Sequence, residues 1–265
     1  MSGHPRPSEL SAPATAARLR TLTPARVGLG RTGVSQQARD VLAFQLAHAQ
    51  ARDAVHARMD AAALQAAIAA IAAPVLTVLR LHSAAPDRAT YLQRPDLGRQ
   101  LDENSRQALA RLDSGRCDVA IVVADGLSAL AVERHVPSLL VELLPRLADW
   151  NIGPFCVVEQ GRVAIGDEIG LAMHAELSVV LIGERPGLSS PDSLGAYITW
   201  QPRPGRTDAE RNCISNIRSE GLSYREAAGQ LVNCLATARE RRLTGTALSG
   251  TKTLPAEDNR NGGQP

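Results

Sequence analysis

The chain has 265 residues, enough to bury a sizeable core in one large domain or two smaller ones. Its formal net charge is +2 and only 3% of its residues are aromatic, so it lacks the basic surface and the stacking rings typical of nucleic-acid binding. Its single lysine, Lys252, stands near the C-terminus, which leaves Schiff-base chemistry and a phosphate-loop lysine without a good candidate.

The cysteine pattern favours reduced thiols in a cytoplasmic protein. Cys117, Cys156, Cys213 and Cys234 lie far apart, and no two of them have the two-residue spacing of a zinc knuckle or a redox pair. We therefore predict no metal site.

The two ends of the chain differ in composition from the rest. Residues 1–20 are rich in Pro, Ala, Ser and Arg, and residues 246–265 are rich in Gly, Thr, Asn and Pro without an apolar period. This composition predicts a disordered leader and a disordered tail. No stretch approaches the roughly 18 apolar residues that span a bilayer, so we expect no membrane association.

A glycine-rich segment, residues 23–33, imitates a dinucleotide-binding fingerprint. It contains Gly28, Gly30 and Gly33 at the right spacing, with Asp53 about twenty residues further on. That fingerprint needs a buried strand before it, and the residues before Gly28 are too few and too polar. A stand-alone Rossmann-type nicotinamide oxidoreductase is therefore kept only as the alternative function. We instead expect a lead-in with Ser35 as the N-cap of a long helix.

The period of the apolar residues indicates an α/β fold. Two helices, at residues 36–59 and 60–72, form a helical N-terminal region spanning residues 21–73. Between residues 74 and 245, apolar strands alternate with helical patterns, which predicts a Rossmann-like open, mostly parallel sheet. The expected strands are 75–81, 118–124, 155–158 and 177–182, and the expected helices are 97–112, 127–150 with a break near Pro137, 165–173 and 224–242.

The segment after the strand at 177–182 is the best candidate for a binding site. Ligands of open α/β sheets bind at the carboxyl ends of the strands, and Glu184 follows such an end before Pro186 and Gly187, which shape a tight turn. Asp125 and Glu159 follow two other strands at the same edge and would complete a polar rim. The alternative is that Glu184 only pairs with Arg185 at the surface.

Other motifs carry weaker signals. Ser128 follows a strand as a hydrolase nucleophile does, but the glycine expected two residues later is missing, so it is better explained as a helix N-cap. Arg94, Asp96 and Arg99 could hold an anion at a helix start, or could form local ion pairs. Cys213 has no histidine near it in sequence and fits a binding or packing thiol better than a nucleophile. We predict no catalytic residues.

Six motifs in order give a more specific result: TPARVGLGRTG (23–33), YLQRPDLGR (91–99), DGLS (125–128), GRVAIGDEIG (161–170), VVLIGERPGL (179–188) and RNCISNI (211–217). With these motifs, roughly residues 20–245 resemble the small (light) subunit family of ethanolamine ammonia-lyase. The ends of the chain match nothing useful in that family.

The resemblance implies a lyase that uses adenosylcobalamin, a cobalt cofactor, to convert ethanolamine to acetaldehyde and ammonia by a radical mechanism. This chain would close the cofactor site against a barrel-shaped large subunit in a hetero-oligomer, without contributing substrate-site residues. The helical region 21–73 would contact that subunit, and residues 74–245 would contact the cobalamin. The family's cobalamin contacts correspond to Val163, Glu184 and Cys213. Whether the cytoplasmic complex sits inside a bacterial microcompartment stays open, and a non-enzymatic scaffold subunit is a third hypothesis.

Overall fold

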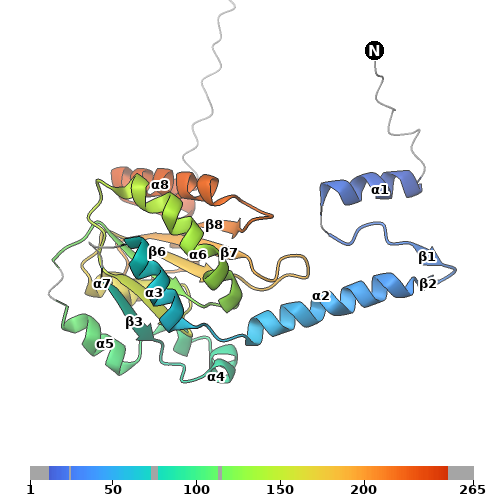
Figure 1. Cartoon of the computed structure of the whole chain (residues 1–265). Helices are drawn as coiled ribbons and strands as arrows, with labels where there is room; N and C mark the ends of the chain where they lie inside the picture. Colours follow the sequence, from blue (N-terminus) through green and yellow to red (C-terminus); the bar gives the residue numbers. More distant parts are fainter. Residues whose placement is uncertain (1–11, 24, 73–76, 113–114, 250–265) are drawn as a thin grey trace, which may run out of the picture.

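The computed structural model describes residues 12–23, 25–72, 77–112 and 115–249 and has an α/β fold built on one six-stranded sheet (Figure 1). The strands lie in the order β3-β5-β4-β6-β7-β8. Only β7 runs against the other five, so the predicted open, mostly parallel sheet is confirmed. The strand bounds are β3 Val78–His82, β4 Val119–Ala124, β5 Phe155–Glu159, β6 Leu177–Gly183, β7 Leu194–Trp200 and β8 Arg211–Ile217.

Helices cover both faces of the sheet, which is why its central strands are apolar on both faces. Side chains of α3 (Ala61–Ala72), α6 (Ala129–Leu143) and α8 (Tyr224–Arg241) pack on one face, and side chains of α5 (Glu103–Ala110) and α7 (Ile165–Ala172) pack on the other. Every residue of β4 and β6 is buried, because both faces of these central strands lie against helices.

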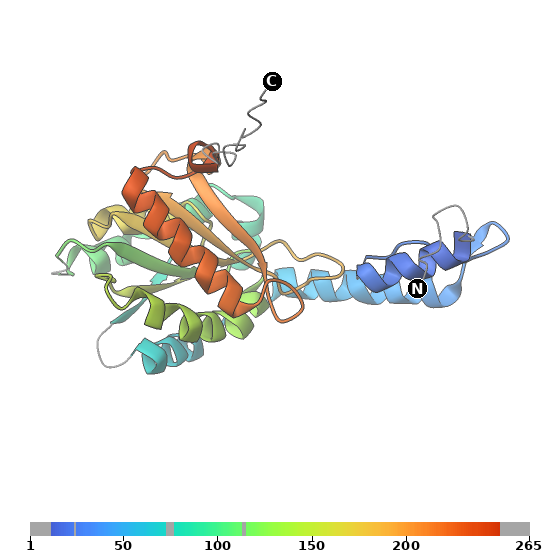
Figure 2. The same ribbon diagram turned by 90° about the horizontal axis from the view of Figure 1, so that it is seen from above.

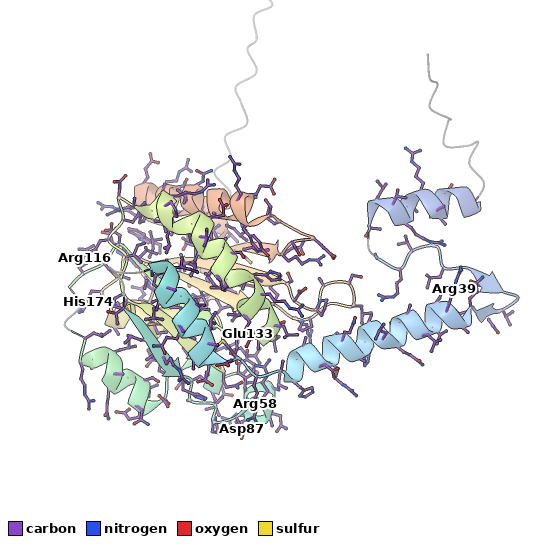
Figure 3. All side chains as sticks on the ribbon, in the orientation of Figure 1. Arg39, Arg58, Asp87, Arg116, Glu133 and His174 are labelled. Atoms are coloured by element: carbon purple, nitrogen blue, oxygen red, sulfur yellow. The ribbon has the colours of Figure 1, made fainter. Side chains whose placement is uncertain are left out.

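An arm formed by residues 12–23 and 25–56 extends away from the sheet (Figures 1 and 2). It consists of α1 (Ala12–Leu22), the two-stranded hairpin β1 (Arg31–Thr32) and β2 (Ser35–Gln36), and the long helix α2 (Ala38–His56). The base of the arm is tied to the body, where the backbone N–H of Asp60 donates to the Glu133 side chain at 2.7 Å (Figure 3, in which Glu133, Arg58 and Asp87 are labelled).

The structure corrects several local predictions. Ser35 is not the N-cap of α2, because it lies in β2 and Gln37 takes the cap position without a side-chain hydrogen bond. Pro137 does not break α6: the turns on both sides of it bury apolar side chains, which hold the helix together across the missing backbone donor. The helix expected over residues 97–112 is split into a 3-10 turn, η2 (Leu97–Arg99), and α5, because Asp102 caps α5 through the backbone N–H of Ser105.

Five elements were not predicted as such. β7 and β8 extend the sheet beyond β6, and each is antiparallel to the strand before it. The short helix α4 (Arg88–Gln93) is capped by Asp87, whose carboxylate accepts from the backbone N–H of Thr90. There are also two 3-10 turns: η3 (Leu144–Leu147) follows α6, and η4 (Asp208–Glu210) precedes β8.

The ends of the described chain differ in part from the expected disorder. Residues 12–20 of the expected leader lie in α1, and residues 246–249 of the expected tail form α9 (Thr246–Ser249). Residues 1–11 and 250–265 lie outside the described part of the chain. In the part that is described, no helix is both long and apolar enough to cross a lipid bilayer.

Candidate functional site

A cavity of about 450 Å³ lies at the carboxyl ends of β5, β4 and β6; we refer to it as the edge pocket. Loops that follow all three strands contribute to its wall, so the prediction that these loops share one edge of the sheet is confirmed. The residues that line the edge pocket are Tyr91, Gly126, Leu127, Arg162, Val163, Ile182, Gly183, Glu184, Arg185 and Tyr197.

Two glycines bring the DGLS and GERPG motifs into contact on one side of the pocket. Gly126 has a φ of +57°, and a Cβ added there would collide with the carbonyl oxygen of Gly183. The backbone N–H of Leu127 donates to that same carbonyl at 2.9 Å. Ser128 caps α6 by accepting from the backbone N–H of Ala131, which confirms its predicted structural role.

Glu184 is half-buried, and its carboxylate is held in place by its neighbours. Its Oε2 accepts hydrogen bonds from the Ser193 hydroxyl and from the backbone N–H of Asn216, the latter at 3.2 Å. Its Oε1 has no hydrogen bond to any described residue. Among the described ion pairs none joins Glu184 to Arg185, so the alternative of a surface pair is wrong.

Val163 and Cys213 lie near Glu184 in different ways. Val163 lines the edge pocket directly, whereas Cys213 is an exposed residue of β8 and pairs in register with Tyr197, a wall residue on β7. Burial first, and then interaction with Cys213, raise the pKa of the Tyr197 phenol. Directly paired residues point to the same face of a sheet, so the Cys213 side chain lies on the face of the sheet that carries Tyr197, a wall residue of the pocket.

Asp125 is buried beneath the edge pocket and does not form part of a polar rim, which corrects the prediction of three rim carboxylates. Its Oδ1 accepts from the backbone N–H of Gly161 at 3.1 Å, and its Oδ2 lies 3.5 Å from Nη1 of Arg88. Burial raises the pKa of Asp125 to about 6, against the opposing effect of Arg88. Glu159 pairs with Arg80 instead. Of the three carboxylates predicted at this edge, Glu184 alone lines the pocket.

Sequence reasoning missed Tyr91 and Arg162. The guanidinium carbons of Arg88 and Arg162 lie 4.8 and 4.2 Å from the centre of the Tyr91 ring, and the Tyr91 hydroxyl donates to the carbonyl of Gly161 at 3.2 Å. The YLQRPDLGR motif could have pointed to Tyr91. Of its charged residues, Arg94 pairs with Asp96 at 2.7 Å on the surface, as the alternative of local ion pairs predicted for these two.

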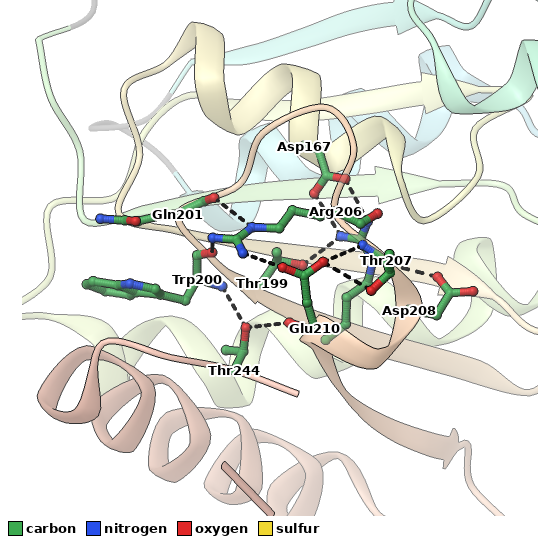
Figure 4. Close-up of polar contacts among 10 residues, drawn as sticks. Asp167, Thr199, Trp200, Gln201, Arg206, Thr207, Asp208, Glu210 and Thr244 are labelled. Atoms are coloured by element: carbon green, nitrogen blue, oxygen red, sulfur yellow. Dashed lines mark hydrogen bonds and ion pairs between the residues drawn. The ribbon is translucent and has the colours of Figure 1, made fainter. Parts of the chain in front are cut away.

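A buried ion pair fixes the beginning of the strand that carries Cys213 (Figure 4). Arg211 donates to both oxygens of Asp167 on α7, from Nη1 at 2.7 Å and from Nη2 at 2.6 Å, and also to the Thr199 hydroxyl. Burial raises the pKa of Asp167, and Arg211 opposes this effect. The contacts of Arg211 therefore join α7, β7 and β8.

The glycine-rich segment lies in the arm, away from the sheet. Gly28 and Gly33 have positive φ angles beside a two-stranded hairpin, and the element that precedes them among residues 12–23 and 25–27 is the helix α1, not a strand. A dinucleotide fingerprint needs a strand–turn–helix context, so the nicotinamide alternative has no support in the described structure.

Comparison with known proteins gives one consistent result. The family model for the ethanolamine ammonia-lyase light chain (EutC) matches residues 13–249. Among the relatives, each named ethanolamine ammonia-lyase small subunit, one from Ralstonia nicotianae is 55% identical over 242 residues, covering 89% of this chain and 88% of the relative. One from Pseudomonas aeruginosa is 56% identical over 245 residues, covering 91% and 89%, and one from Xanthomonas campestris is 54% identical over 244 residues, covering 90% and 89%. The chain therefore belongs to the ethanolamine ammonia-lyase light-chain family.

Proposed function

We propose that this chain is the small subunit of an adenosylcobalamin-dependent ethanolamine ammonia-lyase and forms one side of the cofactor site against a large subunit. The complex is a hetero-oligomer that converts ethanolamine to acetaldehyde and ammonia in the cytoplasm, free or inside a bacterial microcompartment. Family membership supports the lyase assignment. The role of this chain within the complex rests on the geometry of the edge pocket.

The observation that carries the proposal is the grouping of Val163, Glu184 and Cys213 around one pocket. Three motifs distant in sequence supply these residues, and two of the residues line the same cavity of about 450 Å³. A corrin ring with its side chains is far larger than this cavity, so the chain can hold only part of the ring's periphery. Another chain must then cover the rest of the corrin ring, which places the cofactor between two subunits.

The polar groups of the pocket fit the amide-bearing rim of a corrin. Glu184 offers an unpartnered acceptor oxygen, and Arg162 carries a buried Nε without a hydrogen-bond partner among the described residues. When bound, adenosylcobalamin supplies the radical that begins the reaction. The part of this chain is to bind and orient the cofactor's edge and to exclude water from it.

The arm is the proposed contact with the large subunit. Most of the exposed large apolar side chains of the described chain lie on it: Leu19, Leu22, Leu29, Val34, Val41, Leu42, Phe44 and Leu46. A projecting element cannot bury such residues within its own chain, and contiguous exposed apolar surface marks protein contacts.

Reconstitution tests the proposal. The chain is produced alone and together with the large subunit of the same organism, and acetaldehyde is measured after addition of ethanolamine and adenosylcobalamin. We expect turnover only when both chains and the cofactor are present. Acetaldehyde formation by this chain alone would contradict the proposal, because the proposal places the substrate site in the large subunit.

A further inference from the structure

Arg162 is a wall residue of the edge pocket whose hydrogen-bonding capacity is only partly used. Its Nη2 donates to the backbone carbonyl of Tyr91 at 3.2 Å, and its guanidinium stacks on the Tyr91 ring. Its Nε is buried without a partner, and no described residue accepts from its Nη1. Nη1 is not among the buried unpaired atoms, so it is the group of this guanidinium that can donate to an acceptor brought by a ligand.

The backbone that carries Arg162 is held from three sides. The N–H of Gly161 donates to Asp125 at 3.1 Å, the carbonyl of Gly161 accepts from the Tyr91 hydroxyl, and the N–H of Arg162 donates to the carbonyl of Gly98 at 2.7 Å. Gly98 also leaves room for the stack, since a Cβ there would lie 2.8 Å from Cγ of Arg162 and 3.0 Å from the Tyr91 ring. Arg162 is therefore preorganised at the wall of the pocket.

We propose that Arg162 is a further cofactor-binding residue, which acts with Glu184 to recognise a primary carboxamide on the corrin periphery. Arg162 donates to the amide oxygen, and Glu184 Oε1 accepts from the amide nitrogen of the same or a neighbouring side chain. The inference rests on the proposed function above and extends it by naming the chemical group that the pocket selects.

The charges of the pocket favour an amide over a charged group. At the Glu184 position a ligand carboxylate would be repelled and has no hydrogen to donate, and at the Arg162 position a ligand ammonium would be repelled. A neutral amide has one acceptor and two donors, and so satisfies both kinds of wall residue without an unpaired charge. Corrin rings carry primary acetamide and propionamide side chains, which present this chemistry at the rim.

The first test is equilibrium binding of cyanocobalamin to the assembled complex of small and large subunits. We expect Arg162→Met to weaken binding about tenfold or more, the effect of losing one hydrogen bond to a charged group. Arg162→Lys should recover only part of the loss, because an ammonium lacks the planar fork. The control is Arg146→Met, which removes a surface arginine that pairs with Glu142 on α6, and should bind as the wild type does.

The second test uses cobalamin monocarboxylates, in each of which one peripheral amide is hydrolysed to an acid. We expect at least one isomer to bind the wild-type complex about tenfold more weakly than cyanocobalamin, and Glu184→Gln to remove most of that difference. Size-exclusion chromatography confirms that each variant assembles. If Arg162→Met assembles and binds cyanocobalamin within twofold of the wild type, the inference is wrong while the proposed function stands. If the wild-type complex binds no cobalamin at all, the proposed function fails.

Discussion

Arg88 donates from Nε to the backbone carbonyl of Val55 at 2.7 Å, which ties the last turn of the arm helix α2 to the body of the protein. The same guanidinium donates from Nη1 to the carbonyl of Gly126, a residue of the edge pocket, at 2.8 Å. One buried side chain therefore joins the proposed subunit contact to the proposed cofactor site.

Replacing Arg88 by Met should loosen both ends of this connection together. We expect amide hydrogen exchange to become about tenfold or more faster both around residues 55–58 and around residues 126–127, because each region loses a hydrogen bond to a charged group. The control is Arg80→Met, whose partly exposed pair with Glu159 should leave both regions unchanged. A change confined to one of the two regions would show that Arg88 does not couple them.

The buried carboxyl of Asp125 predicts a specific pH dependence of stability. Its pKa is about 6 in the folded protein against 3.8 for the unperturbed group, so between about pH 4 and pH 6 the folded state holds a proton that the unfolded chain has released. The free energy of unfolding of the wild type should therefore fall relative to that of Asp125→Asn as the pH rises through this window. The expected change is on the order of 3 kcal/mol.

Urea unfolding of both proteins at a series of pH values measures this difference. Other carboxylates contribute equally to both proteins and cancel in the comparison. A difference that stays constant from pH 4 to pH 6 would show that Asp125 titrates normally.

The ion pair between Arg211 and Asp167 should be important for folding. Both side chains are 1–2% exposed, so Asp167→Ala leaves a buried guanidinium without its partner and should lower the free energy of unfolding by about 3–5 kcal/mol. Asp208→Ala is the matched control, because Asp208 is 96% exposed and lies 3.7 Å from the same arginine. Its cost should stay within about 0.5 kcal/mol. Equal effects of the two substitutions in urea unfolding would contradict this account.

Assembly should depend on the apolar surface of the arm. Leu42, Phe44 and Leu46 are 63%, 46% and 61% exposed, so changing all three to Ser should leave the stability of the isolated chain nearly unchanged but reduce co-purification with the large subunit. The control changes Val141 and Leu171, exposed apolar residues of the body, to Ser. If the arm variant assembles as well as this control, the large subunit binds elsewhere.

Sequence patterns predicted the elements that are apolar on both faces. β4 and β6 could be recognised because every residue in them is buried, and the strand-end rule then placed Glu184 at a binding edge. β8 was missed because it lies at the edge of the sheet and carries polar residues on its uncovered face, so its sequence, RNCISNI, lacks a clear apolar pattern. The position of Cys213 beside Tyr197 depends on that strand, and only the family resemblance had indicated it.

The role of Arg162 could not be deduced from its local sequence. Its orientation depends on Tyr91 and Gly98, about 70 and 64 residues earlier in the chain, and on the burial of Asp125 beneath the loop. Such contacts arise from packing between loops, which a periodicity argument does not describe. The same holds for Asp125, which the strand-end rule placed at the right edge but assigned to a solvated rim.

Cobalamin binding to Glu184 variants tests the proposed cofactor site most directly. The carboxylate is preorganised by Ser193 and Asn216, so its removal should affect binding more than folding. We expect Glu184→Ala to weaken cyanocobalamin binding to the assembled complex by roughly ten- to a hundredfold, and Glu184→Gln to cost less because one acceptor oxygen remains. Glu103→Ala, a change at an exposed carboxylate on α5, should bind as the wild type does. Glu184→Ala that assembles normally and binds cyanocobalamin as tightly as the wild type would contradict the assignment of the edge pocket to the cofactor.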